Sequence, residues 1–270
     1  DKLERSGGHA EIVTLNSSKR TAPRALAVGP SRTGSDSRMN VHKMASSTAH
    51  AAGIDRVLLG LFRDCGWSLS LERMKSIVDR EAACGVNLFS PQAFLYSIAG
   101  ARGTSGAASQ FHQATYWPHY RLFADYAARL GFALSQGKHK AQAALFYPIK
   151  SFQYEQEQHP DSAIVAMISE YFDIYHTYLP KEHVDFDVLD EDSIKKAMSL
   201  DERLMIQGEE FELLILPPVT AIGYETALKL REFVEDGGKL LATMLLPMRD
   251  ADGDRHDDVA AIFEELFDLD

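Results

Sequence analysis

The chain has 270 residues, of which 45% are hydrophobic and 25% charged, and it carries a formal net charge of -11. This is the composition of an ordinary globular protein, and it excludes a collagen-like, wholly disordered or disulfide-scaffold chain. An acidic surface repels phosphate backbones, so nucleic acid is not an expected partner. No apolar run reaches the ~20 residues that a membrane-spanning helix needs, so no membrane partner is expected either.

Residues 1–40 show no sustained helical or strand periodicity, and Gly, Ser, Thr, Pro and Arg are frequent among them. Such composition predicts a poorly ordered arm over residues 1–40, with one short strand in the stretch 11–15 as the alternative. The sequence does not begin with Met. We therefore expect the chain to be a piece of a longer protein.

The next segment reads as a partial α/β unit spanning residues 41–137. A short apolar run at 55–61 predicts a buried strand, and Ser70 then opens an amphipathic helix that ends near residue 85. The following strand, at 86–89, is halted by Pro91. A strand, helix and strand within about 30 residues predict a parallel crossover. A second helix is expected over residues 118–135, with Gly137 just past its end.

Residues 138–270 alternate regularly between strand and helix patterns. Strands are expected at 141–146, 184–188, 213–216 and 239–243, and helices at 162–178, 192–198, 226–235 and 258–267. This alternation predicts a doubly wound, mostly parallel sheet. The fold class is therefore α/β, with a domain boundary near residues 137–140.

Several familiar catalytic and cofactor motifs are missing. Neither a GxGxxG nor a GxxxxGK[ST] phosphate loop occurs, and the GxSxG nucleophile elbow is absent. The alternating Asp250, Asp252 and Asp254 lack the Gly and Glu that a calcium loop of the EF-hand type requires. Two cysteines outside any CxxC spacing predict no zinc site. We therefore expect no cofactor and no metal.

The segment 85–97 suggests a sugar-binding edge, because a strand ends there in polar and aromatic residues. Aromatic faces stack on sugar rings and amides bind sugar hydroxyls, and in a (β/α)8 barrel such residues lie at the carboxyl ends of the strands. The alternative is that these aromatic side chains are plain core. His112 and His119 flank a nearby aromatic cluster and are expected in the core or on the surface, with a sugar contact as the alternative. The candidate substrate-binding residues are Asn87, Gln92, Tyr96 and Trp117.

Several segments together resemble a known family. They are Lys-Met-Ala-Ser-Ser at 43–47, Arg-Val at 56–57, Gly-Trp-Ser-Leu-Ser at 66–70, Gly-Val-Asn-Leu-Phe-Ser-Pro-Gln-Ala-Phe at 85–94 and Tyr-Trp-Pro at 116–118. They resemble the last part of the catalytic barrel of the α-L-rhamnosidase-like enzymes of glycoside hydrolase family 106. Residues 134–148 are similar to the join between that barrel and a following domain. Residues 213–218 and 237–239 resemble that domain, which is Rossmann-like and akin to flavodoxin-like, class I amidotransferase and β-galactosidase trimerisation folds.

The resemblance implies hydrolysis of O-glycosidic bonds in polysaccharide side chains by two carboxylates that flank the scissile bond. Two departures matter. Gly60 stands where relatives carry a Glu at the end of the strand, and Gln92 stands where they carry a His. Asp64 is then the only carboxylate near the strand end, and it is a weak catalytic candidate. The chain is thus interpreted as a fragment of a glycoside hydrolase. The alternative is a non-catalytic carbohydrate-binding or structural relative.

A third interpretation, an independent flavodoxin-like ligand module, is disfavoured by the missing phosphate loop. The expected partners are a carbohydrate substrate and either other domains of a longer chain or a second copy of this one. The compartment is periplasmic or extracellular if the full-length protein carries a signal peptide.

Overall fold

The structure is a computed structural model that describes residues 10–11, 38–63, 65–104, 108–158 and 162–269. The chain divides into two compact units. The N-terminal unit comprises residues 1–49 and 54–138, and the C-terminal unit comprises residues 50–53 and 139–270. Most of the predicted arm over residues 1–40 lies outside the described residues.

The N-terminal unit is a short parallel sheet with helices. Its elements are α1 (Arg38–Ala51, whose last two residues group with the C-terminal unit), β1 (Ala10–Glu11), β2 (Val57–Leu61), α2 (Leu71–Ala83), β3 (Leu88–Pro91), the 3-10 turns η1 (Gly100–Gly103) and η2 (Trp117–His119), and α3 (Tyr120–Leu134). The strands pair in the order β1-β2-β3, and both pairings are parallel. The predicted parallel strand–helix–strand unit is therefore present.

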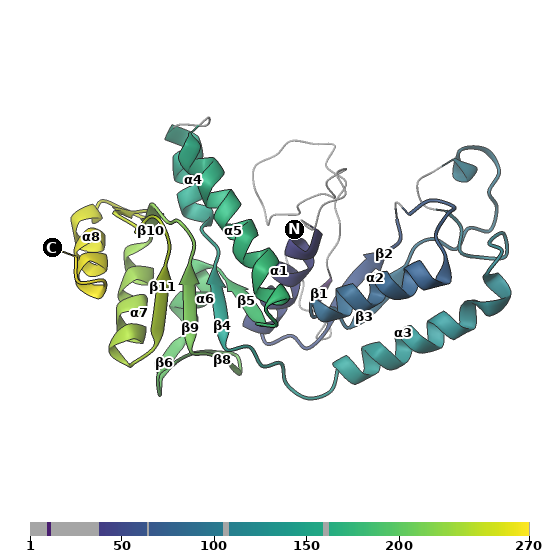
Figure 1. The fold of residues 1–270 in the computed structure, drawn as a ribbon, viewed down its shortest axis with the longest axis horizontal. Coiled ribbons are helices and arrows are strands. Elements are labelled where there is room, and N and C mark those ends of the chain that lie inside the picture. The colour runs from purple at the N-terminus through teal and green to yellow at the C-terminus, as the bar shows by residue number, and fades with distance from the viewer. Residues whose placement is uncertain (1–9, 12–37, 64, 105–107, 159–161, 270) are drawn as a thin grey trace. The chain divides into compact units, whose positions relative to one another are not determined.

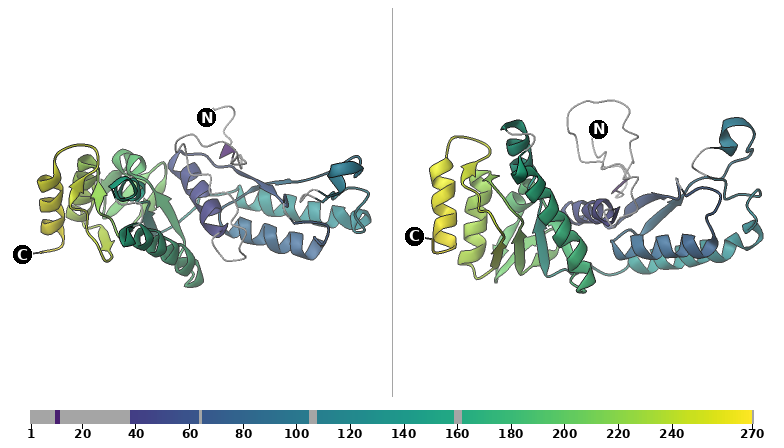
Figure 2. Two further views of the ribbon diagram at one scale, coloured as in Figure 1. Left: turned by 90° about the horizontal axis from the view of Figure 1, so that it is seen from above. Right: turned by 45° about the horizontal axis from the view of Figure 1, so that its top comes forward.

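Burial of the side chains along β2 shows which face of this sheet is covered. Val57, Leu59 and Leu61 are buried, whereas Gly60 is exposed, because successive strand residues point to opposite faces. The buried side chains share one hydrophobic cluster with Met74 of α2 and with residues of α3. Helices α2 and α3 lie side by side (Figures 1 and 2). Ser70 caps α2 as expected, since its side chain accepts a hydrogen bond from the backbone N–H of Arg73.

Helix α3 approaches β3 closely at Gly131. A Cβ atom at this position would lie 2.8 Å from the backbone oxygen of Asn87 and 3.6 Å from the ring of Phe89. A carbon atom cannot sit that close to a backbone oxygen unless one of the two elements moves. Gly131 thus allows the helix to rest directly on the start of β3.

Helix propensity and packing predict opposite outcomes for Gly131→Ala. Propensity alone would stabilise the helix by about 1 kcal/mol, whereas the close approach leads us to expect a loss of about 1–3 kcal/mol through overpacking. Chemical denaturation of the full chain measures the difference. The matched control is Ala128→Gly at an exposed site of α3, which should cost about 1 kcal/mol. A more stable Gly131→Ala variant would contradict the packing.

The C-terminal unit contains a larger parallel sheet. Its strands are β4 (Ala143–Phe146), β5 (Phe186–Leu189), β9 (Leu213–Leu216) and β11 (Lys239–Ala242). They pair in the order β11-β9-β4-β5, and all three pairings are parallel. In order of sequence the strands run 4-3-1-2, which is the winding of flavodoxin-like doubly wound sheets.

Helices cover both faces of this sheet. Ala144 and Phe146 of β4 belong to a buried cluster with residues of α6 (Glu191–Lys196), α7 (Tyr224–Glu235) and α8 (His256–Leu266). Phe186, which pairs with Ala143 and so faces the other way, contacts the ring of His176 on α5 (Ala163–Lys181). The two layers of helices explain why all four residues of β4 are buried.

Smaller elements complete the C-terminal unit. They are α4 (Ile149–Gln158), the antiparallel sheet β6 (Met198–Leu200), β7 (Arg203–Ile206) and β8 (Glu209–Phe211), and the two-stranded pair β10 (Ala221–Ile222) and β12 (Arg249–Asp250). None of these was predicted from the sequence. Within the residues that the structure describes, no helix is both long enough and apolar enough to cross a bilayer.

A buried carboxylate joins two helices of the N-terminal unit. Glu81 of α2 is 1% exposed, and it forms ion pairs with His42 of α1 and with Arg80, whose Nη2 lies 2.8 Å from Oε1. Burial opposes ionisation of this side chain, but the hydrogen bonds and charges of His42 and Arg80 outweigh it and lower its pKa. The carboxylate therefore remains ionised in the folded protein.

This arrangement makes stability depend on pH. Because the folded pKa lies below the ordinary value of 4.5, Glu81 stabilises the fold above that pH and loses its contribution as the pH falls through the folded pKa. We expect Glu81→Gln to cost about 3 kcal/mol at neutral pH and to flatten the acid limb of the stability curve. Denaturation at a series of pH values tests this. Glu72→Gln, at an exposed site in the first turn of α2, should cost less than about 1 kcal/mol.

Candidate functional site

The carboxyl ends of β2 and β3 lie together at one edge of the N-terminal sheet. Gly60 pairs with Ser90 and Leu61 with Pro91, and the backbone N–H of Gln92 donates to the oxygen of Leu61 at 2.9 Å. In barrels built from parallel strands, this is the end at which active sites form. Gly60 faces away from the buried side of the sheet, so the surface beside it is open.

Gln92 is the side chain closest to Gly60 at this edge. A Cβ atom on Gly60 would lie 3.4 Å from Nε2 of Gln92, an ordinary contact distance. The other amide atom, Oε1, accepts a hydrogen bond of 3.1 Å from Nε of Arg63. The side chain of Gln92 is thus held between the two strand ends, where it presents an amide next to a guanidinium.

The loop after β3 is fixed by three polar side chains from residues 109–113. Gln110 is 1% exposed, and its amide donates to the backbone oxygen of Gln92. Ser109 accepts from the backbone N–H of Leu95 at 3.2 Å, and Gln113 donates to the oxygen of Leu95 at 3.0 Å. These bonds connect the backbone of residues 92–95 to the side chains of residues 109–113 beside the strand ends.

Four aromatic rings, one from this loop and three from residues 111–120, pack together. Phe94, Phe111, Trp117 and Tyr120 contact one another with centroid distances of 4.8–6.4 Å, mostly edge to face. Burial, together with the nearby Tyr116, raises the pKa of Tyr120 to about 12, so its hydroxyl stays protonated and donates to Oε1 of Gln110 at 3.2 Å.

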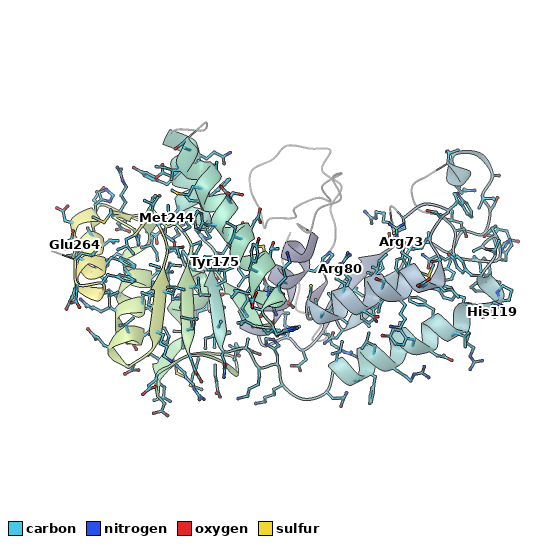
Figure 3. The ribbon with its side chains drawn as sticks, in the orientation of Figure 1. Arg73, Arg80, His119, Tyr175, Met244 and Glu264 are labelled. Carbon is cyan, nitrogen blue, oxygen red and sulfur yellow. The ribbon has the colours of Figure 1, made fainter. Side chains whose placement is uncertain are left out.

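Not every predicted aromatic or histidine side chain joins this packing. Tyr96 does not contribute to it and is 91% exposed. His112 contacts the ring of Phe111 edge-on at 4.8 Å. His119 is exposed at the start of α3 (Figure 3). Of the predicted sugar contacts, Tyr96 therefore offers the most accessible aromatic face.

Asn87 lies at the opposite end of the strands. It is 7% exposed; its Oδ1 accepts from the backbone N–H of Val57 at 2.9 Å, and its Nδ2 donates to the oxygen of Asp55 at 2.7 Å. Both bonds hold the amino end of β2, away from Gln92. The structure thus brings Gly60 and Gln92 together and separates Asn87 from them.

The charge of this edge is distinctive, because residues 82–124 contain neither Asp nor Glu. Described residues 60–63, which end β2 and begin the next loop, also lack a carboxylate, and Asp64 lies outside the described residues. Arg63 and Gln110 were not among the predicted site residues. Arg63 could have been found from the sequence, since it stands two residues beyond the strand end, where site residues of parallel sheets gather.

Asn87→Ala separates a structural from a binding role at this position. We expect a loss of about 2 kcal/mol in unfolding free energy, because the variant leaves a buried N–H and a carbonyl without their partner. Equilibrium unfolding of the full chain is the measurement, with Gln136→Ala at an exposed amide as the matched control. An Asn87→Ala variant as stable as the control would show that these two bonds do not hold β2.

The fold defines the class of protein. The chain resembles solved (β/α)8-barrel glycosidases, so the prediction of a partial barrel is confirmed. A family model described as alpha-L-rhamnosidase matches residues 21–269. The chain belongs to this family, glycoside hydrolase family 106, as its sequence segments indicated. The relation of its C-terminal unit to amidotransferases stays a prediction.

The similar proteins are much longer than this chain. A rhamnosidase from Novosphingobium sp. PP1Y is 17% identical with a TM-score of 0.58, over 88% of this chain and 22% of its own. The exo-beta-1,4-mannosidase Op5Man5 from Opitutaceae bacterium strain TAV5 is 16% identical with a TM-score of 0.52, over 84% and 38%. A protein of Formosa agariphila, named as a candidate beta-glucuronidase, is 26% identical over 207 residues, 74% of this chain and 16% of that protein.

Proposed function

We propose that the chain is part of a hydrolase that cleaves α-L-rhamnosidic bonds in polysaccharide side chains, and that its strand-end edge binds the sugar without supplying the catalytic acid. The claim that this edge does not supply the catalytic acid rests on the lack of Asp and Glu over residues 82–124, together with glycine at position 60. Glycoside hydrolysis of this kind requires two carboxylates. Neither comes from this edge among the described residues.

The side chains that remain suit binding. Gln92 and Arg63 offer an amide and a guanidinium for sugar hydroxyls, and Tyr96 offers an exposed ring on which a sugar face can stack. Gly60 supports the same interpretation, because a glycine leaves room for a ligand close to the sheet. Trp117 contributes less directly, since it packs against Phe94 and Phe111.

Binding and hydrolysis can be measured on the same chain. We expect saturable binding of L-rhamnose by calorimetry and no release of nitrophenol from p-nitrophenyl α-L-rhamnopyranoside. Gln92→Ala and Tyr96→Ala should each weaken binding about tenfold, which corresponds to about 1.4 kcal/mol. Phe132→Ala, an aromatic side chain 67% exposed on α3, is the control and should bind as the unmodified chain does.

Two results would overturn the proposal. Nitrophenol release that is abolished by Asp64→Asn would show that this edge does supply a catalytic carboxylate. Absence of rhamnose binding, or binding that Gln92→Ala and Tyr96→Ala leave unchanged, would favour the alternative of a structural relative.

A further inference from the structure

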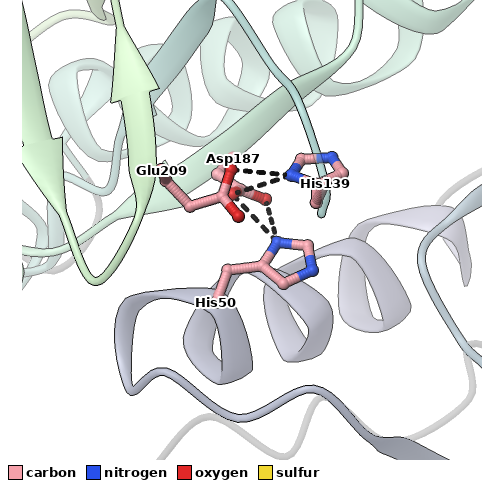
Figure 4. A group of neighbouring side chains, drawn as sticks. All are labelled: His50, His139, Asp187 and Glu209. Atoms are coloured by element: carbon pink, nitrogen blue, oxygen red, sulfur yellow. Dashed lines mark hydrogen bonds and ion pairs between the residues drawn. The ribbon is translucent and has the colours of Figure 1, made fainter. Parts of the chain in front are cut away.

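Four metal-ligating side chains meet in the C-terminal unit, apart from the strand-end edge. His50 lies in the last turn of α1, and His139 precedes β4. Asp187 lies in β5, and Glu209 is the first residue of β8. One ligand atom from each lies within 4.8 Å of all the others. Figure 4 shows the two imidazole rings and the two carboxylates turned toward one another. Segments far apart in the sequence thus converge on one point.

Three of the separations are close to those between the ligands of a small cation, within a group that spans up to 4.8 Å. Nδ1 of His50 lies 3.0 Å from Oδ2 of Asp187, and Nδ1 of His139 lies 2.9 Å from Oε2 of Glu209 and 3.7 Å from Oδ2 of Asp187. Four N and O ligands at 2.0–2.1 Å from a tetrahedral zinc ion stand about 3.3 Å apart. The observed values lie on either side of this distance.

A second carboxylate orients one of the imidazole ligands from outside. Nε2 of His139 lies 2.9 Å from Oδ2 of Asp185. Histidines that bind metals commonly donate their other N–H to such a carboxylate, which fixes the tautomer and the ring orientation. With Nε2–H directed to Asp185, the lone pair of neutral His139 at Nδ1 points toward Glu209 and Asp187.

In this tautomer, Nδ1 of His139 and the carboxylates of Asp187 and Glu209 are all hydrogen-bond acceptors, and they face one another. Ionised carboxylates only accept hydrogen bonds, and a neutral imidazole has a single N–H to donate. Asp187 is fully buried and Glu209 is 8% exposed, so their charges require a nearby positive partner. A metal ion bound by all four ligand atoms would supply positive charge at this point, and the convergence of these atoms beside an outer carboxylate favours such an ion.

We propose that His50, His139, Asp187 and Glu209 bind one divalent transition-metal ion of the Zn²⁺ class, with Asp185 as the outer partner of His139. Two imidazole nitrogens select such ions over Ca²⁺ and Mg²⁺, which prefer oxygen ligands. Four protein ligands leave no coordination position open for water or substrate, which is the arrangement of a closed, structural site rather than a catalytic one. Metal binding then stabilises the C-terminal unit, because unfolding disperses the ligands.

The test uses the full chain, stripped with EDTA and titrated with Zn²⁺ against a chromophoric chelator. We expect one tight site per chain. His139→Gln and Asp187→Asn should abolish it, and Asp185→Asn should weaken it roughly 10- to 100-fold, as the loss of an outer partner does. His183→Asn, at an exposed histidine of the same unit, is the matched control and should bind as the unmodified chain does.

A measurement on the unmodified chain keeps the proposal testable if a ligand variant does not fold. Co²⁺ added to the stripped protein should give the strong visible absorption of a four-coordinate site, and Zn²⁺ should displace it and raise the melting temperature. The proposal is overturned if Zn²⁺ binds no tighter than it does to His139→Gln, if Co²⁺ shows only a weak six-coordinate spectrum, or if Ca²⁺ competes equally with Zn²⁺.

Discussion

The pair of hydrogen bonds made by the side chain of Asn87 holds the beginning of β2 against the chain that leads into β3. By bonding to the backbone of Asp55 and Val57, this amide fixes where β2 begins relative to β3. A shift of one residue would turn every side chain of the strand to the other face. The observed register buries Leu59 and Leu61 and brings Gly60 next to Gln92. The chemistry at one end of the strands thus depends on a polar contact at the other.

Elements with a clear local signal, such as a continuous apolar run or a helix cap, were predictable because that signal agrees with the observed burial and capping. The strand at 213–216 has the expected bounds, and Ser70 caps its helix as its position indicated. Helix α1 gives no such signal, because Ser46, Ser47 and Thr48 interrupt its apolar pattern and return their hydroxyls to backbone carbonyls within the helix. Helix α4 was not predicted, although Pro148 directly precedes it and proline favours a helix start.

The antiparallel sheet β6-β7-β8 depends on turns that were not recognised. Asp201 and Glu202 connect the first hairpin, Gln207 and Gly208 the second, and all four residues have positive φ. Two central residues of this kind are typical of the tight turn that matches strand twist. Gln-Gly resembles the Asn-Gly and Asp-Gly pairs that mark such turns, whereas Asp-Glu does not. The second hairpin carries Glu209 into the four-residue cluster, so neither the sheet nor the cluster could be predicted from spacing.

The acid-free stretch over residues 82–124 also bears on how a complete enzyme would respond to mutation. If this surface binds the sugar as proposed, its amides, rings and guanidinium groups would contribute affinity, but none of them is a carboxylic acid that could protonate a leaving oxygen. Substitutions along this stretch should therefore alter KM while the two pKa values of a bell-shaped rate profile stay fixed. Recognition and proton transfer would then be inherited from different segments of the polypeptide, and each could diverge without the other.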